Sequence, residues 1–118
     1  MSLSVAAITV DCANADVVGT FWSQALDRPL ITDQAPSQFF TRIDAGPSGP
    51  PMMFIAVPEG RTVKNRVHLD LAAEDRDAEV ERLTSLGARI VGSYEEWGTA
   101  WTTMQDPEGN EFCVSNRH

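Results

Sequence analysis

Two side chains, His68 and Glu111, have the types and the positions that could support chemistry. His68 lies in the run VHLDL, where apolar and polar residues alternate as in a strand with one packed face and one open face. His68 therefore shares the open face with Asp70. Glu111 begins the run EFCVS, where Phe112 and Val114 take the opposite face. An imidazole and a carboxylate in such positions can hydrogen-bond each other or a polar ligand, so we expect the functional site there.

The elements that must position this pair follow the order strand, helix, three strands. The helix starts among carboxylates that suit the positive end of a helix dipole, and it ends at Gly87, which favours a left-handed cap. A turn of sequence DPEGN then leads to Glu111, because Pro fixes one dihedral and Gly or Asn tolerates a positive φ. The predicted strands are residues 67–71, 89–94, 100–105 and 111–115, and the predicted helix spans about 74–86.

In the first half of the chain a strand and a helix are again followed by strands. Its predicted elements are a strand at 5–11, a helix from Asn14 to about Leu26, and strands at 39–44 and 52–57. When Thr9 is aligned with His68, Asp11 falls on Asp70 and apolar residues fall on apolar residues, at an offset of half the chain. Such a repeat indicates two copies of one unit, whose open faces would line a shared ligand-binding concavity.

Composition and charge limit the possible partners. The length of 118 residues fits one domain, and 42% apolar with 22% charged residues is typical of a globular protein. A net charge of −8 with scattered basic residues argues against a nucleic-acid partner. Because no stretch is long and apolar enough to span a membrane, we expect a cytoplasmic protein. Cys12 and Cys113 lie in apolar strand contexts, and we expect both to be buried free thiols.

The second half also carries motifs of a known superfamily. The run KNRVHLDL opens its first strand, and the run DPEGNEF leads into its last strand. Over nearly the whole chain, the sequence resembles the vicinal oxygen chelate (VOC) superfamily, and more closely its small glyoxalase-like members. The resemblance implies an α+β fold: a single domain, residues 1–118, with two tandem βαβββ modules (about 4–58 and 64–116) forming a curved mixed sheet. A ferredoxin-like sandwich also fits the order of elements, but three strands after the second helix argue against it.

The resemblance implies where a metal would bind. Metal-using members take one ligand from the first strand and one from the last strand of each module, and the matching residues of the second module are His68 and Glu111. The first module has Thr9 and Met53 at these positions, or Met52 if the register slips by one. Neither Thr nor Met is a good ligand for the ions that this superfamily uses. We therefore expect an incomplete site that needs no cofactor or holds a divalent Mn, Ni, Zn or Fe ion at His68 and Glu111.

Two aspartates share open faces with these ligand positions. Asp11 and Asp70 each come two residues after a ligand position, which places them on the same side of a strand. An Asp late in a strand and before a helix more often accepts hydrogen bonds from loop amides. We therefore expect neither carboxylate to bind a metal.

Two functions remain open on these grounds. In the first, the protein binds a small molecule in the cleft between its modules, as bleomycin-resistance proteins do. The residues expected to contact that ligand are His68, Trp101, Met53, Thr9 and Thr103. In the second, it is a metal-dependent enzyme of lyase, isomerase or dioxygenase type, in which Glu111 is the catalytic residue and moves a proton. The incomplete ligand set favours the first function and disfavours glyoxalase I activity, and the resemblance also implies a homodimer.

Overall fold

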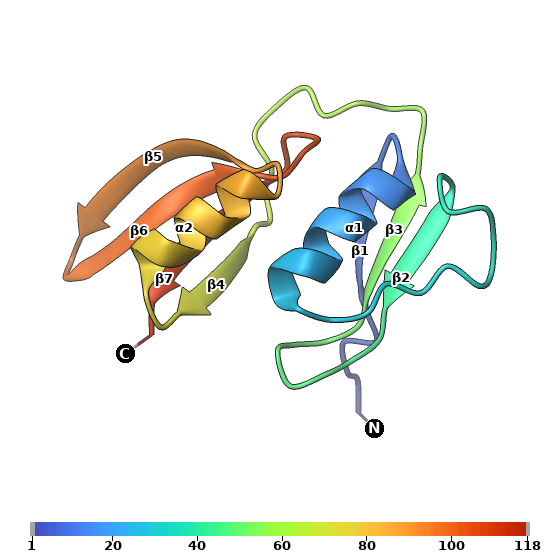
Figure 1. Cartoon of the computed structure of the whole chain (residues 1–118), viewed down its shortest axis with the longest axis horizontal. Coiled ribbons are helices and arrows are strands. Elements are labelled where there is room, and N and C mark those ends of the chain that lie inside the picture. The colour runs from blue at the N-terminus through green and yellow to red at the C-terminus, as the bar shows by residue number, and fades with distance from the viewer. Residues whose placement is uncertain (1, 118) are drawn as a thin grey trace. The chain divides into compact units, whose positions relative to one another are not determined.

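The computed structural model describes residues 2–117, and the chain divides into two compact units, Met1–Gly60 and Arg61–His118. Each unit contains one helix and one mixed sheet; the second has the element order βαβββ, and the first has the same order with one strand fewer after its helix (Figure 1). The predicted α+β class and the two modules are therefore confirmed. Within residues 2–117, neither helix has the length and apolar surface needed to cross a bilayer.

The first module has a short sheet. Its elements are β1 (Ile8–Cys12), α1 (Ala15–Leu26), β2 (Phe40–Ile43) and β3 (Met52–Ala56), and the strand order is β1-β3-β2. The strand β1 runs parallel to β3, and β2 runs antiparallel to it. The strand that should follow the helix is reduced to one bridge between Ile31 and Arg42. The helix begins where Asn14 Oδ1 accepts the backbone N–H groups of Asp16 and Val17, as the sequence predicted.

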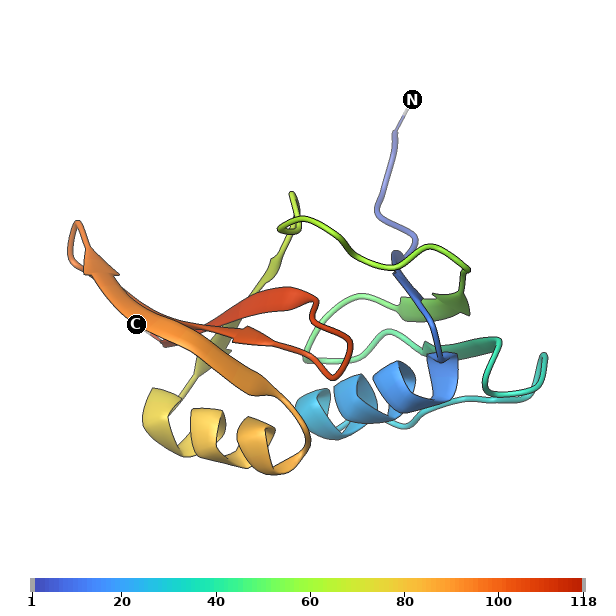
Figure 2. The ribbon, with the colours of Figure 1, turned by 90° about the horizontal axis from the view of Figure 1, so that it is seen from above.

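The second module is complete. Its elements are β4 (Leu69–Ala73), α2 (Arg76–Ser85), β5 (Arg89–Glu96), β6 (Thr99–Gln105) and β7 (Glu111–Asn116), in the strand order β4-β7-β6-β5. The first and last strands are parallel neighbours, and the other pairs are antiparallel. Figure 2 shows α2 against one face of this sheet. On that face Met104, Phe112 and Val114 are fully buried, so the alternate residues of β6 and β7 lie on the open face.

We call residues 57–68, between β3 and β4, the linker, and the strand that follows it, β4, starts later than predicted. The β4–β7 ladder begins with the pair Leu69–Phe112, so His68 immediately precedes the strand and Val67 is 82% exposed. The backbone N–H of Glu111 donates to Asn65 Oδ1 at 3.1 Å. The side chain of Asn65 therefore bonds the first residue of β7, just before the β4–β7 ladder begins.

The turn before β7 is organised by the buried carboxylate of Asp106. Its Oδ1 accepts the backbone N–H groups of Glu108 and Asn110 at 2.9 and 3.0 Å, and its Oδ2 accepts the Asn110 side-chain amide at 3.0 Å. Gly109 has a φ of 89°, a conformation that an L side chain rarely adopts. The DPEGN turn therefore fixes the point at which Glu111 enters the sheet.

Replacing this carboxylate should destabilise the fold. Asp106→Ala removes the buried acceptor of three part-buried hydrogen bonds, and we expect it to lower the free energy of unfolding by about 2–4 kcal/mol. Asp106→Asn keeps an oxygen acceptor and should cost less. Urea unfolding of the two variants measures the difference. An Ala variant as stable as the unchanged protein would show that the turn does not depend on Asp106.

Candidate functional site

The open face of the second module's sheet carries a pocket of about 400 Å³. This volume is in the range of small-molecule sites. Its walls combine charged, polar, aromatic and thiol side chains from β4, β6, β7 and the linker. The lining residues are Lys64, His68, Asp70, Thr99, Trp101, Thr103, Glu111, Cys113 and Ser115.

The registers of the strands explain why these residues meet. Asp70 is the partner of Cys113 in the parallel β4–β7 ladder, and Cys113 is the partner of Thr103 in the β6–β7 ladder. These three side chains therefore form one row across the open face. Two residues further along β7, Ser115 is the partner of Trp101, which begins the next row.

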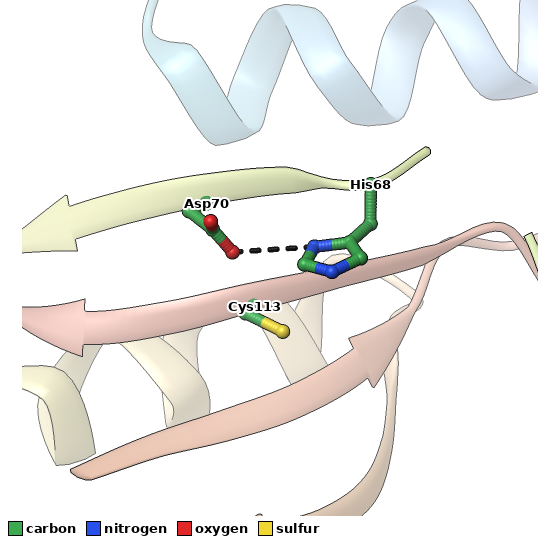
Figure 3. Close-up of side chains that lie close together, drawn as sticks. All are labelled: His68, Asp70 and Cys113. Atoms are coloured by element: carbon green, nitrogen blue, oxygen red, sulfur yellow. Dashed lines mark ion pairs between the residues drawn. The ribbon is translucent and has the colours of Figure 1, made fainter. Parts of the chain in front are cut away.

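His68, Asp70 and Cys113 lie close together among the residues that line the pocket. The Nδ1 of His68 lies 3.2 Å from the Oδ1 of Asp70, and these side chains are 39% and 72% exposed. A nitrogen of His68, a carboxylate oxygen of Asp70 and the Sγ of Cys113 all lie within 4.8 Å of one another. Figure 3 shows the thiol of Cys113 projecting to the same side of the sheet as the imidazole and the carboxylate.

Glu111 has a different partner from the one expected. Its Oε1 lies 3.2 Å from Nη1 of Arg61 and accepts the backbone N–H of Asn65 at 3.3 Å, and the side chain is only 11% exposed. Glu111 and His68 both line the pocket, but the carboxylate forms its ion pair with Arg61. The negative charge of Glu111 is therefore already balanced.

An aromatic pair forms another part of the open face. The rings of Tyr94 and Trp101 lie 5.8 Å apart between centroids, with 32° between their planes. Trp101 and Thr103, two of the residues expected to contact a ligand, line the pocket. Trp97, in the turn between β5 and β6, is 99% exposed and is not among the lining residues.

The first module places its two predicted site residues beside each other. Thr9 is the partner of Met53 in the parallel β1–β3 ladder, while Met52 is buried in the core. In the same ladder Val10 pairs with Phe54, as Leu69 pairs with Phe112 in the second module. This register makes Met53, and not Met52, the counterpart of Glu111.

The residues at the superfamily's ligand positions do not fit a metal centre. Glu111 is engaged by a guanidinium, and a cation at this carboxylate would face the positive charge of Arg61. Thr9 and Met53 supply a hydroxyl and a thioether, which are weak ligands for ions that prefer oxygen and nitrogen. The family arrangement therefore cannot be completed from the residues that the first and last strands offer.

The sequence analysis missed one pocket residue and expected a different partner for another. Cys113 was expected to be a buried thiol, but it is only partly buried and lines the pocket. The signal was its place two residues after Glu111, on the same side of the strand. Asp70 was expected to bind loop amides, but its carboxylate lies against the imidazole of His68.

Solved structures with the same fold include proteins of several activities. A glyoxalase/bleomycin resistance protein/dioxygenase family enzyme from Burkholderia phytofirmans is 19% identical, with a TM-score of 0.75 over 94% of this chain and 96% of its own. The fosfomycin resistance protein FosX from Listeria monocytogenes is 11% identical, with a TM-score of 0.77 over 100% and 96%. Lactoylglutathione lyase from Agrobacterium tumefaciens is 15% identical, with a TM-score of 0.67 over 96% and 92%. At these identities the likeness shows the fold alone.

Sequence comparison gives the family. No curated protein sequence matches the chain. The model of the glyoxalase-like domain family, however, matches residues 7–115, which is almost the whole chain. The superfamily predicted from the two motifs and the repeat is confirmed, and the chain belongs to the glyoxalase-like domain family of the VOC superfamily.

Proposed function

We propose that this protein binds a small organic molecule on the open face of the second module's sheet, without the usual metal ligands of its superfamily. The observation that carries the proposal is the ion pair between Glu111 and Arg61. In a VOC metal site this carboxylate would be free to coordinate an ion. Here it is held by a guanidinium and by a backbone N–H, and so it serves as a wall of the pocket.

The free-energy cost of breaking the Glu111–Arg61 ion pair supports this proposal. The carboxylate is 11% exposed, and removing one member of a largely buried ion pair leaves the other member without compensation. A metal would have to displace Arg61 and then tolerate a nearby guanidinium. The side chains of Thr9 and Met53 could not offset that loss, because they add no charge.

The pocket has the composition of a site for an organic ligand. Trp101 provides a flat apolar surface, and its contact with Tyr94 holds the ring in place. Lys64, His68 and Thr103 supply hydrogen-bond donors around this surface. A planar ligand that carries an oxygen acceptor would match both parts.

The aromatic surface can be tested with a matched pair of tryptophan variants. A panel of aromatic small molecules is first screened by thermal shift, and the dissociation constants of the hits are measured by calorimetry. We expect Trp101→Ala to weaken binding by at least about tenfold, equivalent to about 1.4 kcal/mol. Trp97→Ala removes an exposed ring outside the pocket and should leave the affinity unchanged. Equal affinities in the two variants, or no hit in the panel, would contradict the proposal.

The ion pair of Glu111 can be tested by a double-mutant cycle. We expect Arg61→Met and Glu111→Gln to show a coupling of about 1–2 kcal/mol in urea unfolding, because both charges are partly shielded from water. The control is the exposed pair Arg117–Glu74, which has a similar separation of 3.3 Å. Its coupling should be below about 0.5 kcal/mol. Equal couplings for the two pairs would show that Arg61 does not hold Glu111 in the folded protein.

A further inference from the structure

We propose that the pocket also contains a site for a zinc-type divalent cation, made by His68, Asp70 and Cys113. This set differs from the ligand positions of the superfamily, because Asp70 and Cys113 replace Glu111. The inference goes beyond small-molecule binding and does not depend on it. Among residues 2–117, this is the group of three histidine, cysteine or acidic side chains whose donor atoms lie within 4.8 Å of one another.

The sheet itself brings the three donors together. His68 and Asp70 are two residues apart, so their side chains leave the chain on the same side. Asp70 and Cys113 are direct partners in a parallel ladder, where neighbouring strands lie about 4.8 Å apart. Two paired strands therefore hold the carboxylate and the thiol, and the residue just before β4 adds the imidazole over the same small area (Figure 3).

The distances are close to those of a loaded site. Zinc bonds of about 2.0–2.3 Å place the ligands of a tetrahedral site roughly 3.3–3.8 Å apart. The Nδ1 of His68 and the Oδ1 of Asp70 are already 3.2 Å apart. The remaining separations are at most 4.8 Å, which small side-chain rotations can close. Three protein ligands would leave a fourth position for water or a ligand oxygen.

The donor set selects the type of ion. A thiolate is a soft ligand that favours zinc or cobalt, whereas magnesium and calcium prefer sites made of oxygen. The charges of Asp70 and of a Cys113 thiolate would neutralise a divalent ion. The hydroxyl of Thr103 lies 3.5 Å from the Sγ of Cys113 and can orient the sulfur, as partners outside the ligand shell do in other metal sites.

Cobalt is the probe that reports the thiol directly. The purified full chain is freed of metal with a chelator and titrated with Co²⁺ alone, while the ultraviolet thiolate-to-cobalt charge-transfer band is recorded. We expect about one ion per chain with this band present. Cys113→Ser should abolish the band and weaken Co²⁺ binding at least tenfold. Cys12→Ser changes a buried thiol of the first module and should leave both unchanged.

Protection of Cys113 from alkylation by Zn²⁺ gives a second measurement, and it uses the unchanged protein. Iodoacetamide should alkylate Cys113 in the unchanged protein, and added Zn²⁺ should slow this reaction at least tenfold, as followed by peptide mass spectrometry. Zn²⁺ should also raise the melting temperature, because it binds the folded arrangement of ligands. Asp70→Asn should reduce that rise.

Several results would overturn the site. They are the absence of Co²⁺ binding, binding without a thiolate band, and alkylation of Cys113 at the same rate with Zn²⁺ present. Loss of binding in Glu111→Gln but not in Cys113→Ser would instead indicate the usual ligand position of the superfamily. Binding of the aromatic panel in the presence of a chelator tests the proposed function separately, so the two failures can be told apart.

Discussion

The parallel pairing of the first and last strands of each module is the constraint on which the site depends. In the second module this pairing sets Asp70 against Cys113, and in the first it sets Asp11 against Ile55. Parallel neighbours cannot be joined by a tight hairpin, so the helix and the remaining strands must lie between them in the chain. The residues of the pocket are therefore far apart in sequence, and the ladder decides which of them become neighbours.

Charge compensation then separates this protein from a typical metal-binding member of its superfamily. Glu111 stands at the expected position at the start of β7, but Arg61 and Asn65 from the linker engage its carboxylate. The side chain of Asn65 also accepts the backbone N–H of Glu111. The linker therefore contacts both the backbone and the carboxylate of Glu111. One segment, which precedes β4 and lies outside the sheet, thereby changes what the same residue can do.

Much of the fold could be predicted because its signals are local. Alternating residues gave the strands of both modules, Asn14 gave the start of α1, and the DPEGN run gave the turn that Asp106 organises. The half-chain repeat linked these local signals into two modules. The pattern of each strand also divides its residues between two faces, and Trp101 and Thr103 lie among the pocket residues.

The errors arose where contacts between distant residues decide the outcome. Nothing near Glu111 in the sequence indicates that Arg61 is its partner. Likewise, nothing near His68 indicates that the β4–β7 ladder begins only at Leu69. The apolar neighbours of Cys113 suggested a buried thiol, although the alternation of β7 places it beside Glu111 on the open face. After α1 the sequence predicted a loop, and the structure has no strand there, only a single bridge between Ile31 and Arg42.

The two modules also show how a repeated fold can place different side chains at matching positions. In the aligned ladders, Thr9 corresponds to His68, Asp11 to Asp70, and Ile55 to Cys113, so the carboxylate is the one group that both modules share. The backbone requires only that these positions face outward from the helix, and it tolerates any side chain that fits there. A donor set of nitrogen, oxygen and sulfur therefore exists in the second module and has no counterpart at the matching positions of the first. Because the shared Asp11 has neither an imidazole nor a thiol at those positions, it is the natural internal comparison for what Asp70 gains from His68 and Cys113.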